Sequence, residues 1–200
     1  MTTDDLQDPY CYQGTSVLIN KFNLRNFDKL KQIERVLTGA RLIDLHKKII
    51  FNKFDFVHLK TIHKYIFQDI YPFAGKIRTC DISKGIPFCH AIYIKKSAHK
   101  LFKELALENY LQDLNFADIC ERGAYYLCEI NSIHPFREGN GRTQREFLRQ
   151  LFLMNGFNLN YAFTSKEEMV AASIAGMIAD YAPMTAILKK CTTQAIKKYD

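Results

Sequence analysis

The stretch that decides the fold of this chain is His134-Pro135-Phe136-Arg137-Glu138-Gly139-Asn140-Gly141-Arg142-Thr143-Gln144-Arg145. Pro135 disfavours helical geometry in the residue before it, so we expect a helix to end near His134. The glycines at 139 and 141 tolerate positive φ, and a second helix is expected from about residue 141 or 142 to Gly156, a suitable C-terminal stop. The stretch therefore predicts a short loop between two helices.

The same stretch predicts a site for phosphate chemistry. Gly139-Asn140-Gly141 stands before a helix start, where successive backbone N–H groups can converge on an anion. Arg142 and Arg145 are three residues apart, hence on one helix face, and can add charge-assisted bonds to phosphate oxygens. Glu138 supplies the hard oxygen ligand by which Mg²⁺ is held beside substrate phosphates. His134 has a pKa range suited to removing a proton from an incoming hydroxyl.

Each of these residues also has a purely structural interpretation. A His before Pro is usually a helix-end residue, a Gly-Asn-Gly is usually a turn, and two Arg at this spacing are usually a solvated face. Nine specified positions at roughly 5% usage each should nevertheless recur by chance only about once in 10¹¹ starts. The joint interpretation as a site is therefore favoured over the separate ones.

Outward from this stretch the periodicity is mostly helical. Apolar residues at helical spacing predict one helix through Leu30, Ile33 and Leu37 and a second, with Asp55 as N-cap, through Leu59, Ile62, Ile66 and Ile70. Ser97 is expected to open a third, and a wide stripe from Phe116 to Ile130 predicts a buried central helix. Ser165 to Glu168 is typical of a capping box, and Pro183 suits the first turn of the last helix.

Between about Lys76 and Lys95 the pattern changes. Ile77, Thr79 and Ile92 to Ile94 flank the turn-rich run Ser83-Lys84-Gly85-Ile86-Pro87, which cannot continue a helix. This segment predicts a β-hairpin or extended flap. The predicted fold class is all-α, a helical bundle with one hairpin.

Composition limits the remaining possibilities. The 200 residues suit one domain, for which we predict an N-terminal extension over about 1–20 and a core over about 21–200. No apolar run approaches the length of a membrane span and no secretion signal is evident, so a cytoplasmic protein is expected. The six cysteines form no CxxC pair, which favours reduced thiols. The net charge of +7 is dispersed, which favours a solvated surface and requires no direct nucleic-acid contact; a basic face for an acidic or nucleic-acid-associated partner is the alternative.

At every specified position the central stretch resembles the Fic signature, HPFx(D/E)GNGRxxR. The similarity extends to Asp8-Pro9-Tyr10 with the residues up to Leu18, and to the run from Leu59 through His63 and Arg78. Gln13 and Phe73 depart from the usual Pro and Trp of small bacterial Fic proteins.

The resemblance implies protein adenylylation, in which His134 is the base for a target Tyr, Ser or Thr hydroxyl and ATP donates AMP. It implies that Glu138 binds Mg²⁺, that Gly139, Asn140 and Gly141 hold the phosphates, and that Phe136, after Pro135, anchors the loop. It also implies that a flap of Ser83, Lys84, Gly85, Ile86, Pro87, Phe88 and Cys89 docks the target. An extended edge can bind a peptide by main-chain pairing, although a purely structural hairpin is the alternative.

Three functional classes stay open. The first is adenylylation; the second is γ-phosphoryl transfer, as in the Doc branch; the third is a catalytically silent binding module. Doc-like proteins carry Ala and Lys where Gly139 and Gly141 stand, and a Lys there obstructs the α-phosphate position, so Gly141 favours AMP transfer.

The resemblance also implies partners. Targets of the small bacterial relatives include ATPase subunits of type II topoisomerases, and the family was first associated with cell filamentation. Many Fic proteins are inhibited by a helix with the pattern (S/T)xxxE(G/N), whose Glu pairs with the Arg that corresponds to Arg145. Glu108-Asn109 and Glu138-Gly139 have the wrong residues four positions before the Glu, and Met169 follows Glu168, so no inhibitor is found within the chain. We therefore expect a small antitoxin-like protein that inhibits in trans.

Overall fold

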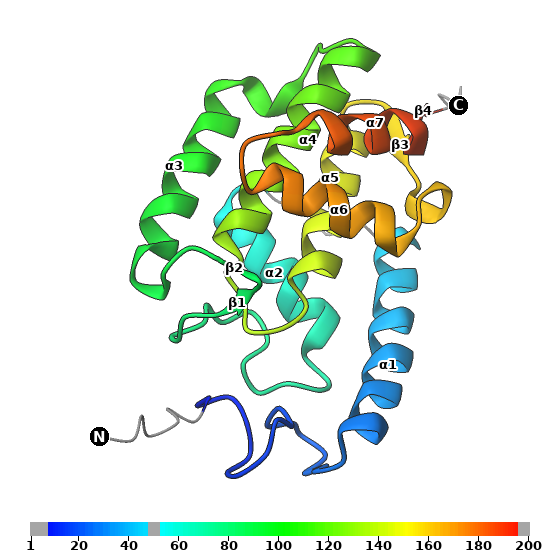
Figure 1. Ribbon diagram of the computed structural model, residues 1–200. Coiled ribbons are helices and arrows are strands. Elements are labelled where there is room, and N and C mark those ends of the chain that lie inside the picture. The colour runs from blue at the N-terminus through cyan, green and yellow to red at the C-terminus, as the bar shows by residue number, and fades with distance from the viewer. Residues whose placement is uncertain (1–7, 48–52, 196–200) are drawn as a thin grey trace.

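The two helices expected around His134 lie at the centre of the structure, a computed structural model that describes residues 8–47 and 53–195. Figure 1 shows them, α4 (Phe116–Ile133) and α5 (Asn140–Met154), between α3 (Ile94–Leu107) and α1 (Phe27–Lys47). α5 also packs against α2 (Phe56–Phe67), and α4 packs against α7 (Ala182–Cys191). The remaining elements are β1 (Ser83–Lys84), β2 (Ile86–Pro87), η1 (Ala91–Tyr93), η2 (Asn109–Leu111), β3 (Phe157–Leu159), η3 (Tyr161–Phe163), α6 (Lys166–Gly176) and β4 (Thr192–Gln194).

Local sequence signals explain most helix ends. Asp55 caps α2 by accepting a hydrogen bond from the His58 N–H, and Ser165 with Glu168 forms the predicted capping box of α6. Pro183 stands in the first turn of α7 as expected. Gly156, just past α5, has a φ of +81°, a conformation that favours glycine.

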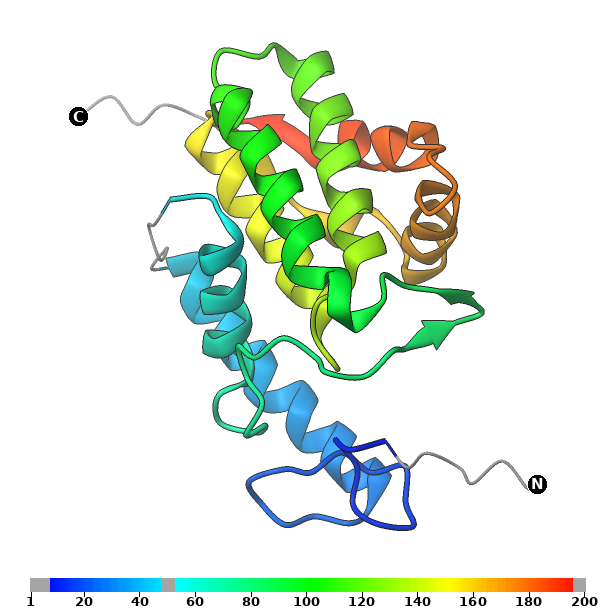
Figure 2. The same cartoon turned by 90° about the vertical axis from the view of Figure 1, so that its left-hand side faces the viewer.

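The predicted hairpin is present but shorter than expected. Ser83 pairs with Pro87 and Lys84 with Ile86, around Gly85. Figure 2 shows this hairpin projecting from the end of the bundle. The expectation of extended structure at 92–94 and a helix start at Ser97 is wrong: η1 begins at Ala91 and α3 at Ile94. The reason is Asp81, whose Oδ1 accepts the Ala91 N–H at 2.7 Å and starts helical turns there.

A second strand pair was not predicted. β3 pairs antiparallel with β4, and Leu159 lies opposite Thr192. Each strand has three residues, too few to show a period of two, and the partners are separated by α6 and α7. The helical fold class with its hairpin is confirmed, and this pair is an addition to it.

One contiguous cluster of buried apolar side chains extends from Val17 to Cys191. Phe147 of α5 is fully buried and makes edge contacts with the rings of Phe54 and Phe102. All six cysteines are free thiols, as predicted. No helix in the described residues is both long and apolar enough to cross a membrane.

Candidate active site

The loop from His134 to Gly139 is fixed by its own side chains. The Asn140 Nδ2 donates to the Phe136 carbonyl at 2.7 Å, and the Phe136 N–H donates to the Asn140 Oδ1 at 2.9 Å. Asn140 is buried, so this pair of bonds occupies its amide. The structure shows the Asn140 side chain holding the loop, while its backbone N–H at the start of α5 can face an anion, so its role in phosphate binding stays a prediction.

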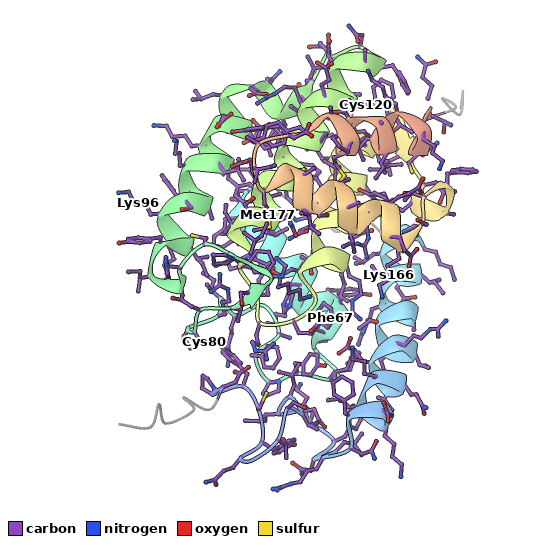
Figure 3. All side chains as sticks on the ribbon, in the orientation of Figure 1. Phe67, Cys80, Lys96, Cys120, Lys166 and Met177 are labelled. Carbon is purple, nitrogen blue, oxygen red and sulfur yellow. The ribbon has the colours of Figure 1, made fainter. Side chains whose placement is uncertain are left out.

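Gly139 is the N-cap of α5, with a φ of +81°. A Cβ at this position would lie 2.1 Å from Cζ of Phe67, so no side chain fits. Figure 3 labels Phe67 on α2, beside the loop that joins α4 to α5. Because the first N–H groups of a helix lack intrahelical acceptors, the start of α5 presents free donors beside this loop.

His134 is the C-cap of α4 and adopts a left-handed conformation, with φ 45° and ψ 61°. Its ring stacks on Phe88, with 3.7 Å between ring centroids. Nδ1 lies 3.1 Å from the carbonyl oxygen of Asn131, which can only accept, so Nδ1 carries the proton and Nε2 keeps its lone pair. Burial lowers the pKa of His134 to about 4, which keeps the ring neutral near pH 7.

Arg78 connects the flap to His134. Its guanidinium is buried and donates to the carbonyl oxygens of His134 at 2.8 Å, Cys80 at 2.7 Å and Cys89. Its backbone N–H donates to the Pro135 carbonyl at 3.0 Å. One side chain therefore joins both ends of the flap to the end of α4.

His63 of α2 holds the loop between His134 and Gly139 in place. Its Nδ1 accepts the Gly75 N–H at 2.8 Å, so its Nε2 must be the donor to the Glu138 carbonyl, 2.9 Å away. Its ring stacks on buried Phe136 at 3.8 Å, which gives the predicted anchor a partner. Neither His63 nor Arg78 was assigned a role from the sequence, although both stand in the run that resembles the Fic family.

The two arginines of the stretch diverge. Arg142 lies between α1 and the loop: its Nη2 is 2.6 Å from Oε1 of Glu34 and 3.5 Å from Oε1 of Glu138, and its Nη1 is 3.1 Å from Oγ1 of Thr38. Carboxylates on α1 and on the loop thus hold Arg142, and its contact with phosphate stays a prediction. Arg145 forms no ion pair with any carboxylate between residues 8–47 or 53–195.

Most of the predicted site residues line one cleft of about 270 Å³. His134, Glu138, the Gly139 to Gly141 turn and Arg145 line one side, and the flap lines another with Ile82, Ser83, Lys84 and Phe88. Apolar side chains of α6 close it, namely Met169, Val170 and Ile174, with Met177 just beyond the helix. Residues 83–87 of the flap are exposed, whereas Phe88 is buried and Cys89 half-buried, so the last two do not lie on the exposed edge.

Comparison with known proteins agrees with this geometry. The model of the Fic/DOC family matches residues 53–152. Over 190 residues the chain is 36% identical to the probable protein adenylyltransferase Fic of Escherichia coli (strain K12), and the match covers 94% of both proteins. The chain belongs to the Fic/DOC family.

Other Fic proteins extend the comparison. The protein adenylyltransferase VbhT of Bartonella schoenbuchensis is 36% identical over 94% of this chain, which spans 39% of that protein. BepC of Bartonella tribocorum, solved with bound AMPPNP, superimposes with a TM-score of 0.88 at 26% identity and covers 94% of this chain and 97% of BepC. A Bartonella quintana Fic domain with bound ADP gives 0.86 at 27% identity and covers 93% and 95%.

Proposed function

We propose that this Fic protein is a protein adenylyltransferase that transfers AMP from ATP to a Tyr, Ser or Thr hydroxyl of another protein. The observation that carries the proposal is the cleft in which the free Nε2 of His134 and the start of α5 meet. Relatives at 35 to 36% identity bear the name protein adenylyltransferase, and similar structures hold AMPPNP or ADP.

The nucleotide would lie along the start of α5. Free N–H groups at residues 140 and 141 suit phosphate oxygens, and the unpaired guanidinium of Arg145 suits the far end of the triphosphate. Burial lowers the pKa of Arg145, yet a guanidinium still keeps its charge near pH 7. The apolar side chains of Met169, Val170 and Ile174 offer a wall for a planar base.

Glu138 fits the role of a Mg²⁺ ligand. Its Oε1 accepts the Gly139 N–H at 2.9 Å, and its carboxylate lines the cleft. The described residues contain no cluster of three or more metal-ligating side chains, which suits an ion held by one carboxylate, substrate phosphates and water. When bound, Mg²⁺ would neutralise charge that develops on the phosphates.

The transfer needs a general base for the target hydroxyl and a leaving group that takes the negative charge. The target hydroxyl oxygen forms a bond to the α-phosphorus while its proton passes to Nε2 of His134. The bond from the α-phosphorus to the bridging oxygen breaks, and pyrophosphate leaves with the electron pair. The Asn131 carbonyl, which holds Nδ1–H, keeps the ring in the tautomer this step requires.

Radiolabelled ATP separates the functional classes. Purified chain in a cell lysate should label protein bands with α-labelled ATP and leave them unlabelled with γ-labelled ATP. Label from the γ-position alone would identify a Doc-like phosphotransferase instead. No label from either, with ATP still bound, would identify a silent binding module.

The exposed strands β1 and β2 are proposed to dock the target segment. Their open edges can pair with an extended peptide and bring its hydroxyl toward His134. Following the resemblance, the ATPase subunit of a type II topoisomerase is the target we propose, with filamentation or slowed growth as the effect. Mass spectrometry of the α-labelled band tests this, and a band without topoisomerase peptides refutes it.

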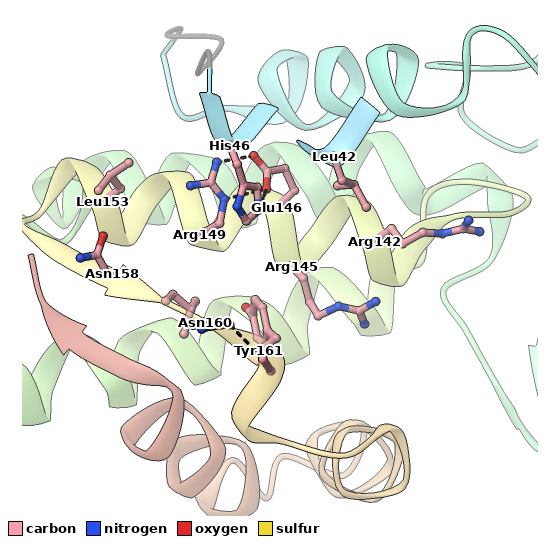
Figure 4. A pocket seen from close by; sticks show the side chains of 12 residues that line it. Leu42, His46, Arg142, Arg145, Glu146, Arg149, Leu153, Asn158, Asn160 and Tyr161 are labelled. Carbon is pink, nitrogen blue, oxygen red and sulfur yellow. Dashed lines mark hydrogen bonds and ion pairs between the residues drawn. The ribbon is translucent and has the colours of Figure 1, made fainter. Parts of the chain in front are cut away.

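We further propose that a small antitoxin-like protein inhibits the enzyme in trans through Arg145. Arg145 lines the cleft and also a cavity of about 460 Å³ between α1, α5 and η3. Figure 4 shows this second cavity, where Arg145 and Tyr161 point between α5 and η3. The Tyr161 hydroxyl is buried without a hydrogen-bond partner, so a carboxylate entering there would meet a cation and a free donor.

Co-expression tests the inhibitor. A small protein with an (S/T)xxxE(G/N) helix should silence labelling by this chain, and changing that Glu to Ala should restore it. The matched change in this chain is Tyr161→Phe, which should weaken inhibition while AMP transfer persists. If truncating either end of the chain activates an otherwise inactive protein, the inhibitor lies within the chain and this proposal fails.

A further inference from the structure

A cavity of about 460 Å³ lies between α2 and the loop that follows it, and it shares no lining residue with the cleft at His134. Four of its lining residues are lysines: Lys21, Lys60, Lys64 and Lys76. None of the lining residues is acidic; the others are Val57, Thr61, Gln68, Tyr71, Pro72, Ala74 and Gly75. The cavity therefore concentrates positive charge that adenylylation does not use.

The lysines converge because the backbone around them is fixed. Lys60 and Lys64 stand one turn apart on α2. The loop closes on them at Gly75, where a Cβ would lie 2.8 Å from Cβ of Lys64 and 3.2 Å from the Lys60 carbonyl oxygen. The N–H of Lys76 donates to the Phe73 carbonyl, and the N–H of Lys21 donates to the Ile70 carbonyl. Three separate segments are thus held in place around one cavity.

None of these four lysines forms an ion pair with a carboxylate in the part of the chain that the structure describes. Arg41 and, more weakly, the charge of Lys21 lower the pKa of Asp69, but both oxygens of Asp69 bind Arg41, at 2.7 and 2.9 Å. By contrast, Arg122 and Arg149 each pair with a Glu. Because adjacent like charges destabilise the folded state, an unpaired cluster is better explained by a ligand than by stability.

We propose that this lysine cavity docks an acidic segment of a partner protein. Lysine ammonium groups suit separate carboxylates, and half-exposed Val57 gives the rim an apolar contact. Single-stranded nucleic acid is disfavoured, since the lining holds no arginine and its one aromatic ring, Tyr71, is buried and offers no stacking face.

A fluorescent decaglutamate peptide provides the test. Its affinity for the full chain, measured by fluorescence anisotropy at physiological ionic strength, should fall at least about tenfold in the K60E/K64E double variant. The matched control is K95E/K96E, which makes the same charge change on exposed positions of α3. Figure 3 shows Lys96 on the outer side of that helix. The control should bind the peptide within about twofold of the unmodified chain.

Thermal melting adds a second readout. K60E/K64E should melt at the same temperature as the unmodified chain or higher, because the reversal relieves repulsion. Equal losses of peptide binding in both variants would show a general charge effect and overturn the proposal. So would no measurable binding by the unmodified chain, or tighter binding of a ten-nucleotide thymidine strand than of the peptide. None of these measurements depends on AMP transfer, so they test the docking proposal independently of the proposed enzyme activity.

Discussion

At the scale of single residues, hydrogen-bond geometry fixes the state of two histidines. His134 can only donate through Nδ1 to Asn131, and His63 can only accept through Nδ1 from Gly75. Accepting through Nδ1 requires a neutral ring in His63, and burial lowers the pKa of His134 to about 4, so both are neutral near pH 7 with opposite tautomers. The first is poised to take a proton, and the second holds a loop.

Replacing His134 by Ala should abolish transfer and leave ATP binding nearly intact. The change removes the base but neither the turn at Gly139 nor Arg145, and loss of a general base costs about 10²- to 10⁴-fold in rate. Labelling with α-labelled ATP gives the rate, and calorimetric titration with ATP gives the affinity. Transfer at the original rate in this variant would contradict the assignment.

Gly139 and Gly141 should respond differently to Ala. Gly139→Ala forces a Cβ into Phe67 at a φ of +81°, so unfolding free energy should fall by about 2 kcal/mol or more. Gly141→Ala meets only the mobile end of Arg145 at 3.2 Å and should change stability by less than about 0.5 kcal/mol. Urea denaturation measures both, and equal effects would show that Phe67 does not constrain the turn.

At the scale of elements, the flap owes its position to one side chain. Two-residue strands have too few hydrogen bonds to hold a hairpin by themselves. Arg78 supplies the missing support, since it joins Cys80 and Cys89 at the two ends of the flap to His134 at the end of α4.

Arg78→Lys should therefore uncouple target docking from nucleotide binding. Lysine keeps the charge but cannot donate to several carbonyls at once, so the flap loosens. We expect kcat/KM for protein targets to fall by about tenfold or more, with ATP affinity within about twofold. Faster hydrogen exchange at the Cys89 amide, which donates to Ser132, should accompany the loss. An equal loss of ATP affinity would show that Arg78 supports the whole site instead.

At the scale of the whole molecule, the neutral histidines tie stability to pH. His63 has a pKa of about 4 in the folded chain, lowered from 6.5 by burial, and its two hydrogen bonds need the neutral ring. Between these values the unfolded chain binds a proton that the folded chain does not. The contribution of neutral His63 to the free energy of unfolding is thus fully present above pH 6.5 and is lost as the pH falls toward 4.

The His63 contribution should lower the unfolding free energy by about 2 kcal/mol between pH 7 and pH 5. His63→Gln is the matched control, because its amide can accept from Gly75 and donate to Glu138 without titrating. Urea denaturation at both pH values should give a smaller pH dependence in this variant. The same dependence in both proteins would assign the effect to other groups, such as His58, whose pKa burial also lowers.

The sequence by itself determined the helix that ends at His134, the turn at Gly139, the cap at Asp55 and the capping box of α6. These features follow from the geometry of Pro, Gly and short polar side chains, whose effects reach only a few residues along the chain. The tertiary structure alone decided that Arg142 pairs with Glu34 of α1, that Arg78 holds the flap, and that β3 pairs with β4. Each of these depends on groups far apart in sequence, 108 positions in the case of Glu34 and Arg142, which only the packed core brings together.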